Sequence, residues 1–290
     1  MTTVQTVKTY YSLTKPGVLY GNALTAAAGF LLASRGSIDF WLFVALCLGT
    51  TFVIASACVL NNYLDQDIDS KMARTKKRAL VQGDVAGWKA VVFSVVLAIA
   101  GFGILLTWTN PLVVAIGAIG FVDYVVLYGM LSKRLSIHGT LVGSISGAVP
   151  ILAGYCAVTG VLDAGALLVF LILFLWQMPE FYSIAIYRRK EYAAAGIPVM
   201  SVVKGVKSTK RQIAVYTLAF VISTLALTYY GYTGVSYFVV MAATGLYWLW
   251  LGIKGLHVRN DEAWAKKMFR FSLIILLVFC FMISVDAWLP

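Results

Sequence analysis

The chain has 290 residues, of which 61% are hydrophobic and 12% are charged, and its formal net charge is +11. Soluble globular domains have about 45–50% apolar and about 25% charged residues, so this composition excludes an ordinary soluble domain. A strongly basic chain can bind nucleic acid, but here the lysines and arginines lie between long apolar runs, which excludes that function.

A transmembrane helix needs about 20 predominantly apolar residues. Runs of this kind recur along the whole chain and predict an all-α, polytopic membrane protein with about nine transmembrane helices. In chain order the predicted spans are Val18–Ala33, Phe40–Leu60, Ala90–Thr107, Pro111–Leu131, Ile137–Val158, Ala164–Ile186, Ile213–Tyr230, Val235–Ile253 and Phe269–Leu289.

The basic residues are distributed asymmetrically over the connections between these spans. Twenty-two of the 23 lysines and arginines fall on one side, and only Arg35 falls on the other. By the positive-inside rule, the N-terminus is predicted to be cytoplasmic and the C-terminus periplasmic. The segment before the first span has neither a secretory apolar region nor an Arg-rich transit character, which favours a bacterial plasma membrane. The two long cytoplasmic connections, 61–89 and 187–212, are the predicted catalytic loops.

The first of these loops begins with a run of polar and acidic residues. If the second span continues as a helix past the membrane surface, Asn61, Asp65 and Asp69 share one face, whereas Asp67 points elsewhere. Two carboxylates on one face repel each other unless a cation lies between them. Oxygen ligands suit a hard ion, and Mg²⁺ commonly takes one or two carboxylates together with water and substrate phosphates. We therefore predict that Asn61, Asp65 and Asp69 bind Mg²⁺.

Basic residues follow directly, and we predict that Lys71, Arg74 and Arg78 bind the diphosphate of a substrate that the metal bridges. The alternative is a solvated cytoplasmic loop whose basic residues only obey the positive-inside rule. That alternative applies most strongly to Lys76 and Lys77.

The run NNYLDQDIDSKMARTKKR resembles the first Asp-rich motif, N-x-x-x-D-x-x-x-D, of the UbiA-type intramembrane aromatic prenyltransferase superfamily. Within that superfamily, the chain is most similar to the heme O synthases, or protoheme IX farnesyltransferases. The similarity covers nearly the whole chain, including TKPGVLYGN (14–22), SKRLSIHGTLVGSISGAVP (132–150), GYCAVTG (154–160), WQMPEFYSIAIYRRKEY (176–192) and GIPVMSVVKG (196–205).

This resemblance implies one transmembrane prenyltransferase domain over residues 1–290, with the helices bundled around a central cavity that opens toward the cytoplasmic side. It also implies a Mg²⁺-dependent enzyme of the bacterial inner membrane that transfers farnesyl from farnesyl diphosphate to a vinyl group of heme b. Water then completes the side chain of heme O. Heme b would be a substrate rather than a cofactor, and heme A synthase or a terminal oxidase would act downstream.

The sixth span ends in a second cluster, in which Glu180 and Tyr187 share a helical face and are predicted to be catalytic together with Asp65 and Asp69. Arg188, Lys204 and Lys207 are predicted to add diphosphate contacts. The resemblance implies a histidine at position 180, so the glutamate is a departure. It leaves open whether Glu180 is a metal ligand, a proton acceptor, a heme contact or a carboxylate paired with a neighbouring arginine.

Three alternatives stay open at this stage. The same site could serve another aromatic acceptor, such as a quinone precursor. A transporter would instead use midplane acids and broken spans, whereas the acids here cluster at a cytoplasmic helix end. A structural assembly factor of the oxidase would not need Asp65.

Overall fold

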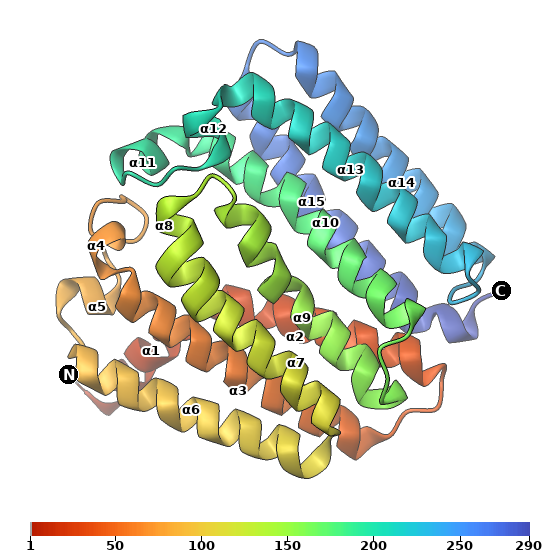
Figure 1. The fold of residues 1–290 in the computed structure, drawn as a ribbon, viewed down its shortest axis with the longest axis horizontal. Helices are drawn as coiled ribbons and strands as arrows, with labels where there is room; N and C mark the ends of the chain where they lie inside the picture. The colour runs from red at the N-terminus through yellow and green to blue at the C-terminus, as the bar shows by residue number, and fades with distance from the viewer. Residues whose placement is uncertain (1) are drawn as a thin grey trace.

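The computed structural model describes residues 2–290, and every regular element in this range is a helix (Figure 1). The elements are α1 (Thr3–Leu13), α2 (Pro16–Ser34), α3 (Phe40–Leu64), α4 (Gln66–Asp69), α5 (Ala79–Gln82), α6 (Gly87–Trp108), α7 (Pro111–Val122), η1 (Asp123–Ser132), α8 (Lys133–Leu135), α9 (Gly139–Thr159), α10 (Ala164–Tyr187), α11 (Arg189–Ala194), α12 (Met200–Val203), α13 (Gly205–Tyr229), α14 (Val235–Lys254), η2 (Gly255–His257), α15 (Asp261–Val285) and η3 (Asp286–Trp288).

Within residues 2–290, nine helical segments are long and apolar enough to cross a membrane, which confirms the predicted number of spans. The starts of two spans differ most from the prediction. The helices α13 and α15 begin at Gly205 and Asp261, whereas their apolar runs begin at 213 and 269. The residues before each apolar run include good helix formers such as lysine and arginine. Each helix therefore begins about two turns before its apolar run.

The helices α2 and α9 cross at close range because each has a glycine at the contact. A Cβ added at Gly29 would lie 2.2 Å from the carbonyl oxygen of Ile151, and one at Gly154 would lie 2.0 Å from that of Ala26. In a membrane, where lipid competes for apolar surface, small residues of this kind allow the backbone contact that holds helices together. This close crossing holds α2 and α9 in a fixed position relative to each other.

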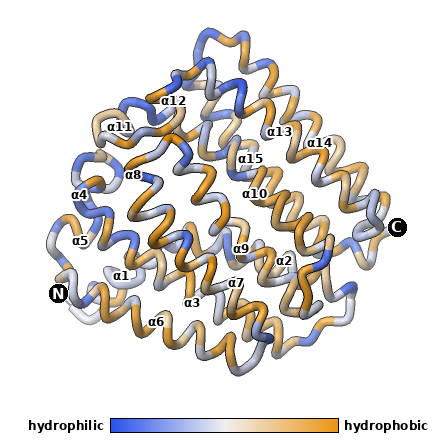
Figure 2. Tube along the Cα trace, in the orientation of Figure 1, coloured by the Kyte–Doolittle hydropathy of each residue, from blue (hydrophilic) through white to orange (hydrophobic). Residues whose placement is uncertain are grey.

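The two long connecting loops lie at the same end of the bundle. Figure 2 shows the hydrophilic stretches around α4, α11 and α12, at the end where the N-terminus lies, and the C-terminus lies at the opposite end. The two long loops pack against each other there through a small apolar cluster of Ile68, Met72, Ala195 and Ile197. The residues that carry the two sequence motifs are therefore held beside one another.

The fourth span changes from an α-helix to a π-helix at Asp123. The buried carboxylate of Asp123 accepts a hydrogen bond of 3.0 Å from the backbone N–H of Ser146 on α9. In the π-helical segment, the rings of Tyr124 and Tyr128 stack with their centroids 5.8 Å apart, and both line the main cavity. Local π-helical geometry is frequent at functional sites, because it changes which side chains face inward.

Candidate functional site

A cavity of about 640 Å³ lies among α2, α3, α7, α9, α10 and α15. Charged residues of the loops line one end of it, and apolar side chains such as Val53, Leu173 and Trp176 line the remainder. A cavity divided in this way suits an elongated ligand with a charged head and an apolar body.

The acids of the first motif lie on one face at the charged end. The backbone N–H of Asp65 donates to the carbonyl oxygen of Asn61 at 3.0 Å, and that of Asp69 donates to the carbonyl oxygen of Asp65 at 2.8 Å. Helical spacing is thus kept across the bend between α3 and α4. All three side chains belong to residues at most 3% exposed and line the cavity. The Asp67 side chain is 59% exposed and lies outside the cavity lining.

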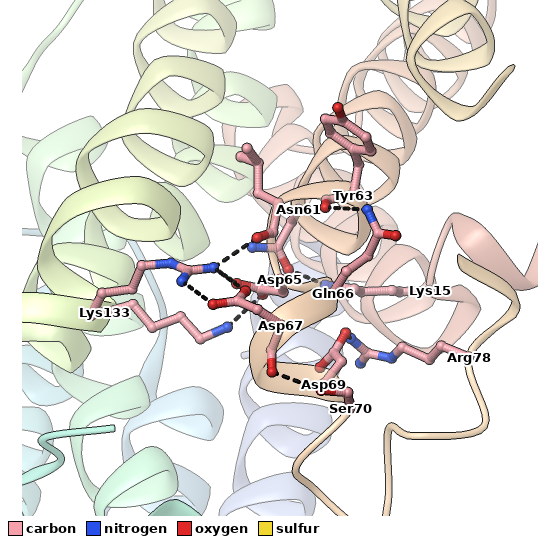
Figure 3. A network of polar contacts seen from close by, with 12 residues as sticks. Lys15, Asn61, Tyr63, Asp65, Gln66, Asp67, Asp69, Ser70, Arg78 and Lys133 are labelled. Carbon is pink, nitrogen blue, oxygen red and sulfur yellow. Dashed lines mark hydrogen bonds and ion pairs between the residues drawn. The ribbon is translucent and has the colours of Figure 1, made fainter. Parts of the chain in front are cut away.

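Asn61, Asp65 and Asp69 each contact one basic side chain (Figure 3). The pairs are Lys15 with the side-chain oxygen of Asn61, Lys133 with Asp65 at 2.5 Å, and Arg78 with Asp69 at 2.5 Å. A further arginine, Arg134, binds Asp67 with both nitrogens at 2.8 Å and lies 3.7 Å from Asp65. These partners offset the cost of burying the charges of Asp65 and Asp69 away from water.

Burial and pairing change the protonation of the groups around the acids. Burial lowers the pKa of Lys15 to about 8, whereas the hydrogen bonds from Arg134 lower the pKa of Asp67 to about 2. Lys15 also has a φ of 54°, in the left-handed region that lysine rarely adopts. This strained backbone immediately before Pro16 directs the lysine side chain to Asn61, and strain of this kind tends to occur at functional sites.

The oxygen atoms on this face fit a hard divalent cation. Within residues 2–290, no three His, Cys, Asp or Glu side chains converge as a complete metal site. Asp65 nevertheless has a buried carboxylate oxygen, Oδ1, with no hydrogen-bond partner among the described residues. Two carboxylates and an amide oxygen match the protein share of a Mg²⁺ site, in which water and substrate phosphate provide the other ligands. The donor set is therefore incomplete until a phosphate-bearing ligand joins it.

The second motif contributes residues of α10 and the turn that follows it. Glu180, directly after Pro179, is 8% exposed and lines the cavity, and no hydrogen bond or ion pair joins its carboxylate to another described residue. Tyr187 lines the cavity nearer the charged end. Its ring packs on Phe269 at 5.9 Å between centroids, and the guanidinium of Arg188 lies 5.3 Å from that ring.

Only part of the predicted diphosphate set reaches the cavity. Arg74, Arg78 and Arg188 line it, whereas Lys71, Lys204 and Lys207 are exposed and lie outside its lining. Lys204 directly precedes α13 and Lys207 lies in its first turn, whereas the buried cation of this helix is Lys210, paired with Asp261 of α15. Because α13 begins before its apolar run, Lys207 is part of a helix. A helix directs only some of its side chains inward, and Lys207 is not among them.

The cavity also contains residues that sequence reasoning assigned only to membrane topology or did not single out. Lys15 and Lys133 line it, as do the phenols of Tyr124, Tyr128 and Tyr192. Burial raises the pKa of Tyr192, on the second loop, to about 12, so this phenol keeps its proton at neutral pH. The signals available for Lys15 were its place directly before a proline at the start of a span and its place in the segment TKPGVLYGN, which carries the family resemblance.

A family model described as the UbiA prenyltransferase family matches residues 22–274. The chain belongs to this family. The protoheme IX farnesyltransferase of Serratia proteamaculans is 49% identical over 280 residues, which cover 97% of this chain and 95% of that relative. The protoheme IX farnesyltransferase 2 of Chromobacterium violaceum is 50% identical over 284 residues, which cover 98% and 94%. These matches confirm the resemblance seen in the sequence.

Two solved structures share the fold of this family member. One, from work on digeranylgeranylglyceryl phosphate synthase in membranes, has a TM-score of 0.82 at 20% identity and covers 98% of this chain and 99% of its own. A UbiA homolog from Archaeoglobus fulgidus, bound to GPP and Mg²⁺, has a TM-score of 0.71 at 13% identity, with coverage of 95% and 99%. At these identities the likeness concerns the fold alone.

Proposed function

We propose that this membrane protein is a prenyltransferase that moves the farnesyl group of farnesyl diphosphate to a vinyl group of heme b and so forms heme O. The observation that carries the proposal is the buried face of Asn61, Asp65 and Asp69, with a cation beside each residue, at the charged end of an apolar cavity. The names of relatives about half identical over nearly the full length support farnesyl as the donor group and heme as the acceptor. Heme b is a substrate in this reaction.

The charged end has the composition that a diphosphate requires. Five cationic side chains line the cavity, and they are Lys15, Arg74, Arg78, Lys133 and Arg188. Three carboxylates line it, so positive charge is in excess. Arginine forks bind phosphate oxygens in a planar, bidentate manner, whereas lysine acts as a point charge. These five residues would hold the outer oxygens of the diphosphate, and the proposal leaves out Lys71, Lys204 and Lys207.

Asn61, Asp65 and Asp69 would hold Mg²⁺ in this site. The bound ion would neutralise negative charge on the departing diphosphate. The Asp65 oxygen that takes part in no hydrogen bond and the shared face of the three residues support this assignment, as does the bound Mg²⁺ named for the Archaeoglobus homolog. Tyr187, whose ring lies beside the guanidinium of Arg188, would keep that cation directed at the phosphates.

The remainder of the cavity serves the prenyl chain. Apolar side chains from at least four spans, among them Val53, Leu173 and Leu276, would enclose farnesyl and exclude bulk water. When the allylic carbon–oxygen bond breaks, the cations at the charged end stabilise the negative charge that accumulates on the diphosphate. The apolar walls protect the allylic cation until the vinyl carbon of heme attacks it.

The location and orientation follow from the charge distribution. We place the chain in a bacterial inner membrane as one domain, 1–290, with its N-terminus in the cytoplasm and its C-terminus in the periplasm. The charged end of the cavity would then face the compartment that contains soluble farnesyl diphosphate. Heme O would pass to heme A synthase or a terminal oxidase.

The proposal can be tested with purified protein, heme b, farnesyl diphosphate and Mg²⁺. Asp65→Asn and Asp69→Asn should each lower heme O formation by at least about 10²-fold, because each removes charge from the metal face. Asp67→Asn is the matched control, since this neighbouring acid lies outside the cavity lining, and it should keep its activity. Pyrophosphate release and the mass of the heme product are the two measurements.

The possible results separate the alternatives. Pyrophosphate release that requires a quinone precursor instead of heme would identify another acceptor. No release with any acceptor would favour a transporter. Heme O formation in cells that is unchanged by Asp65→Asn would favour a structural assembly role.

A further inference from the structure

The proposed reaction releases a proton inside the apolar cavity. As the allylic carbon–oxygen bond breaks, its electron pair leaves with the diphosphate. The vinyl π electrons form the new carbon–carbon bond, and a cation remains on the vinyl carbon next to the porphyrin ring. Water adds to that carbon and must lose one proton to become the hydroxyl group. Loss of a proton from a neighbouring carbon is the other way to discharge the cation, so a base is needed in either case.

Three carboxylates line the cavity, and two of them are already held by cations. Asp65 pairs with Lys133 and Asp69 pairs with Arg78, each at 2.5 Å. These two acids also belong to the metal face, which keeps their oxygens engaged. The third carboxylate is Glu180, which has no hydrogen bond or ion pair with another described residue.

Other bases are scarce around the ligand space. Neither His138 nor His257 belongs to the cavity lining. The amide of Gln177, three residues before Glu180, donates to the carbonyl oxygens of Leu173 and Ser144 and is not basic. Among the described lining residues, Glu180 is therefore the carboxylate available to take up a proton.

Glu180 also lies at a suitable depth. It precedes Tyr187 by two turns of α10, or about 10 Å along the helix axis. Tyr187 lies at the charged end, so Glu180 is set back from the diphosphate contacts toward the apolar part. In a prenyl diphosphate, the reacting carbon adjoins the diphosphate and the chain extends away from it. Glu180 therefore lines the cavity on the apolar side of the phosphate contacts, where the prenyl chain and its acceptor would lie.

We propose that Glu180 is the catalytic proton acceptor, which removes the proton from the water that adds to the prenylated acceptor. The inference rests on the proposed function and assigns one role among those that the sequence left open. The carboxylate becomes a carboxylic acid in this step, and solvent at the charged end restores it before the next turnover. Asp65 and Asp69 are paired with Lys133 and Arg78, so Glu180 is the lining carboxylate that can accept the proton.

The test uses full-length protein in detergent and compares Glu180→Gln with Glu180→His. The amide cannot accept a proton, so Glu180→Gln should form the hydroxylated heme product about 10²–10⁴-fold more slowly in a single turnover. Imidazole can accept one, so Glu180→His should recover a large part of the rate. Glu262→Gln is the control, because Glu262 is exposed and pairs with Lys266 on the surface of α15. Binding of farnesyl diphosphate should be the same in all four proteins.

The outcomes distinguish this inference from the function on which it rests. Hydroxylated product at the wild-type rate from Glu180→Gln would overturn the role of Glu180 and leave the proposed function intact. Loss of farnesyl diphosphate binding in both Glu180 variants would also overturn it, since the residue would then shape or hold the substrate site. Failure of the wild type to release pyrophosphate with heme b would overturn the proposed function and this inference with it.

Discussion

The metal-binding residues proposed for this chain each lie against a positively charged side chain. Lys133 lies 2.5 Å from Asp65, and Arg78 lies 2.5 Å from Asp69. Such pairs offset the cost of burying the two carboxylates and hold their side chains in place. The same cations line the cavity, so they can turn toward phosphate oxygens when a ligand provides them.

Lys15 makes one of these interactions sensitive to pH. Burial lowers its pKa from 10.5 to about 8. Between these two values the unfolded chain holds the proton and the folded chain does not, so this group alone makes stability rise with pH across the window. Ligand binding should respond in the opposite direction, because a neutral amine no longer attracts phosphate.

We therefore predict that the affinity for farnesyl diphosphate falls above pH 8, by up to about tenfold per pH unit. Lys15→Arg should remove this dependence, since a guanidinium stays charged at high pH. Equilibrium binding from pH 7 to pH 10 measures both proteins under the same conditions. The same decline in the two proteins would show that Lys15 does not contact the diphosphate.

At the residue scale, the sequence predicts the arrangement of side chains that are close together along the chain. Asn61, Asp65 and Asp69 follow one another at helical spacing, so their common face could be predicted. Their partners could not, because Lys15 and Lys133 lie 46 and 68 positions away from the residues that they contact. Only the packing of α2 and the fourth span against α3 brings these lysines to the acids.

At the scale of the helices, the geometry of the site depends on backbone contacts between spans. The crossing of α2 and α9 leaves no room for a side chain at Gly154, where a Cβ would lie 2.0 Å from the carbonyl oxygen of Ala26. Backbone atoms cannot move aside as the end of a flexible side chain can. This crossing also carries cavity-lining residues of both helices, including Val18 and Pro150.

Gly154→Ala should lower the free energy of unfolding in detergent by about 1–3 kcal/mol or more, through overpacking. Gly103→Ala is the matched control, because a Cβ at this lipid-facing position of α6 meets nothing within 4 Å. There the higher helix propensity of alanine should leave stability equal or slightly raised. Equal losses in the two variants would contradict the close crossing described for α2 and α9.

Helix ends were the least predictable part of the elements. The apolar pattern indicates where lipid begins, and it does not indicate where hydrogen bonding within a helix ends. For this reason the sequence predicts Lys204 and Lys207 in a catalytic loop, whereas Lys204 directly precedes α13 and Lys207 lies in its first turn. The ion pair between Lys210 and Asp261 joins the start of α13 to α15, so this basic segment does not face the cavity.

At the scale of the whole molecule, the protein divides into a charged end and an apolar body. The nine spans within residues 2–290 could be predicted from hydropathy, whereas the cytoplasmic side of the basic loops stays a prediction from charge. Which spans surround the cavity could not. In α10, 61% of the apolar window is buried inside the protein, against 22% in α6, although both are long and apolar enough to cross a membrane. Lipid and protein interior select the same apolar residues, so the pattern does not separate them.

The binding of metal and diphosphate at one site can be observed in a crystal of the full-length protein grown with Mn²⁺ and a non-hydrolysable analogue of farnesyl diphosphate. We predict an anomalous-scattering peak between the side chains of Asp65 and Asp69, with the diphosphate against it and the farnesyl chain along the apolar walls. A metal peak remote from these two carboxylates, or an analogue bound with its diphosphate in the apolar part, would contradict the site described here.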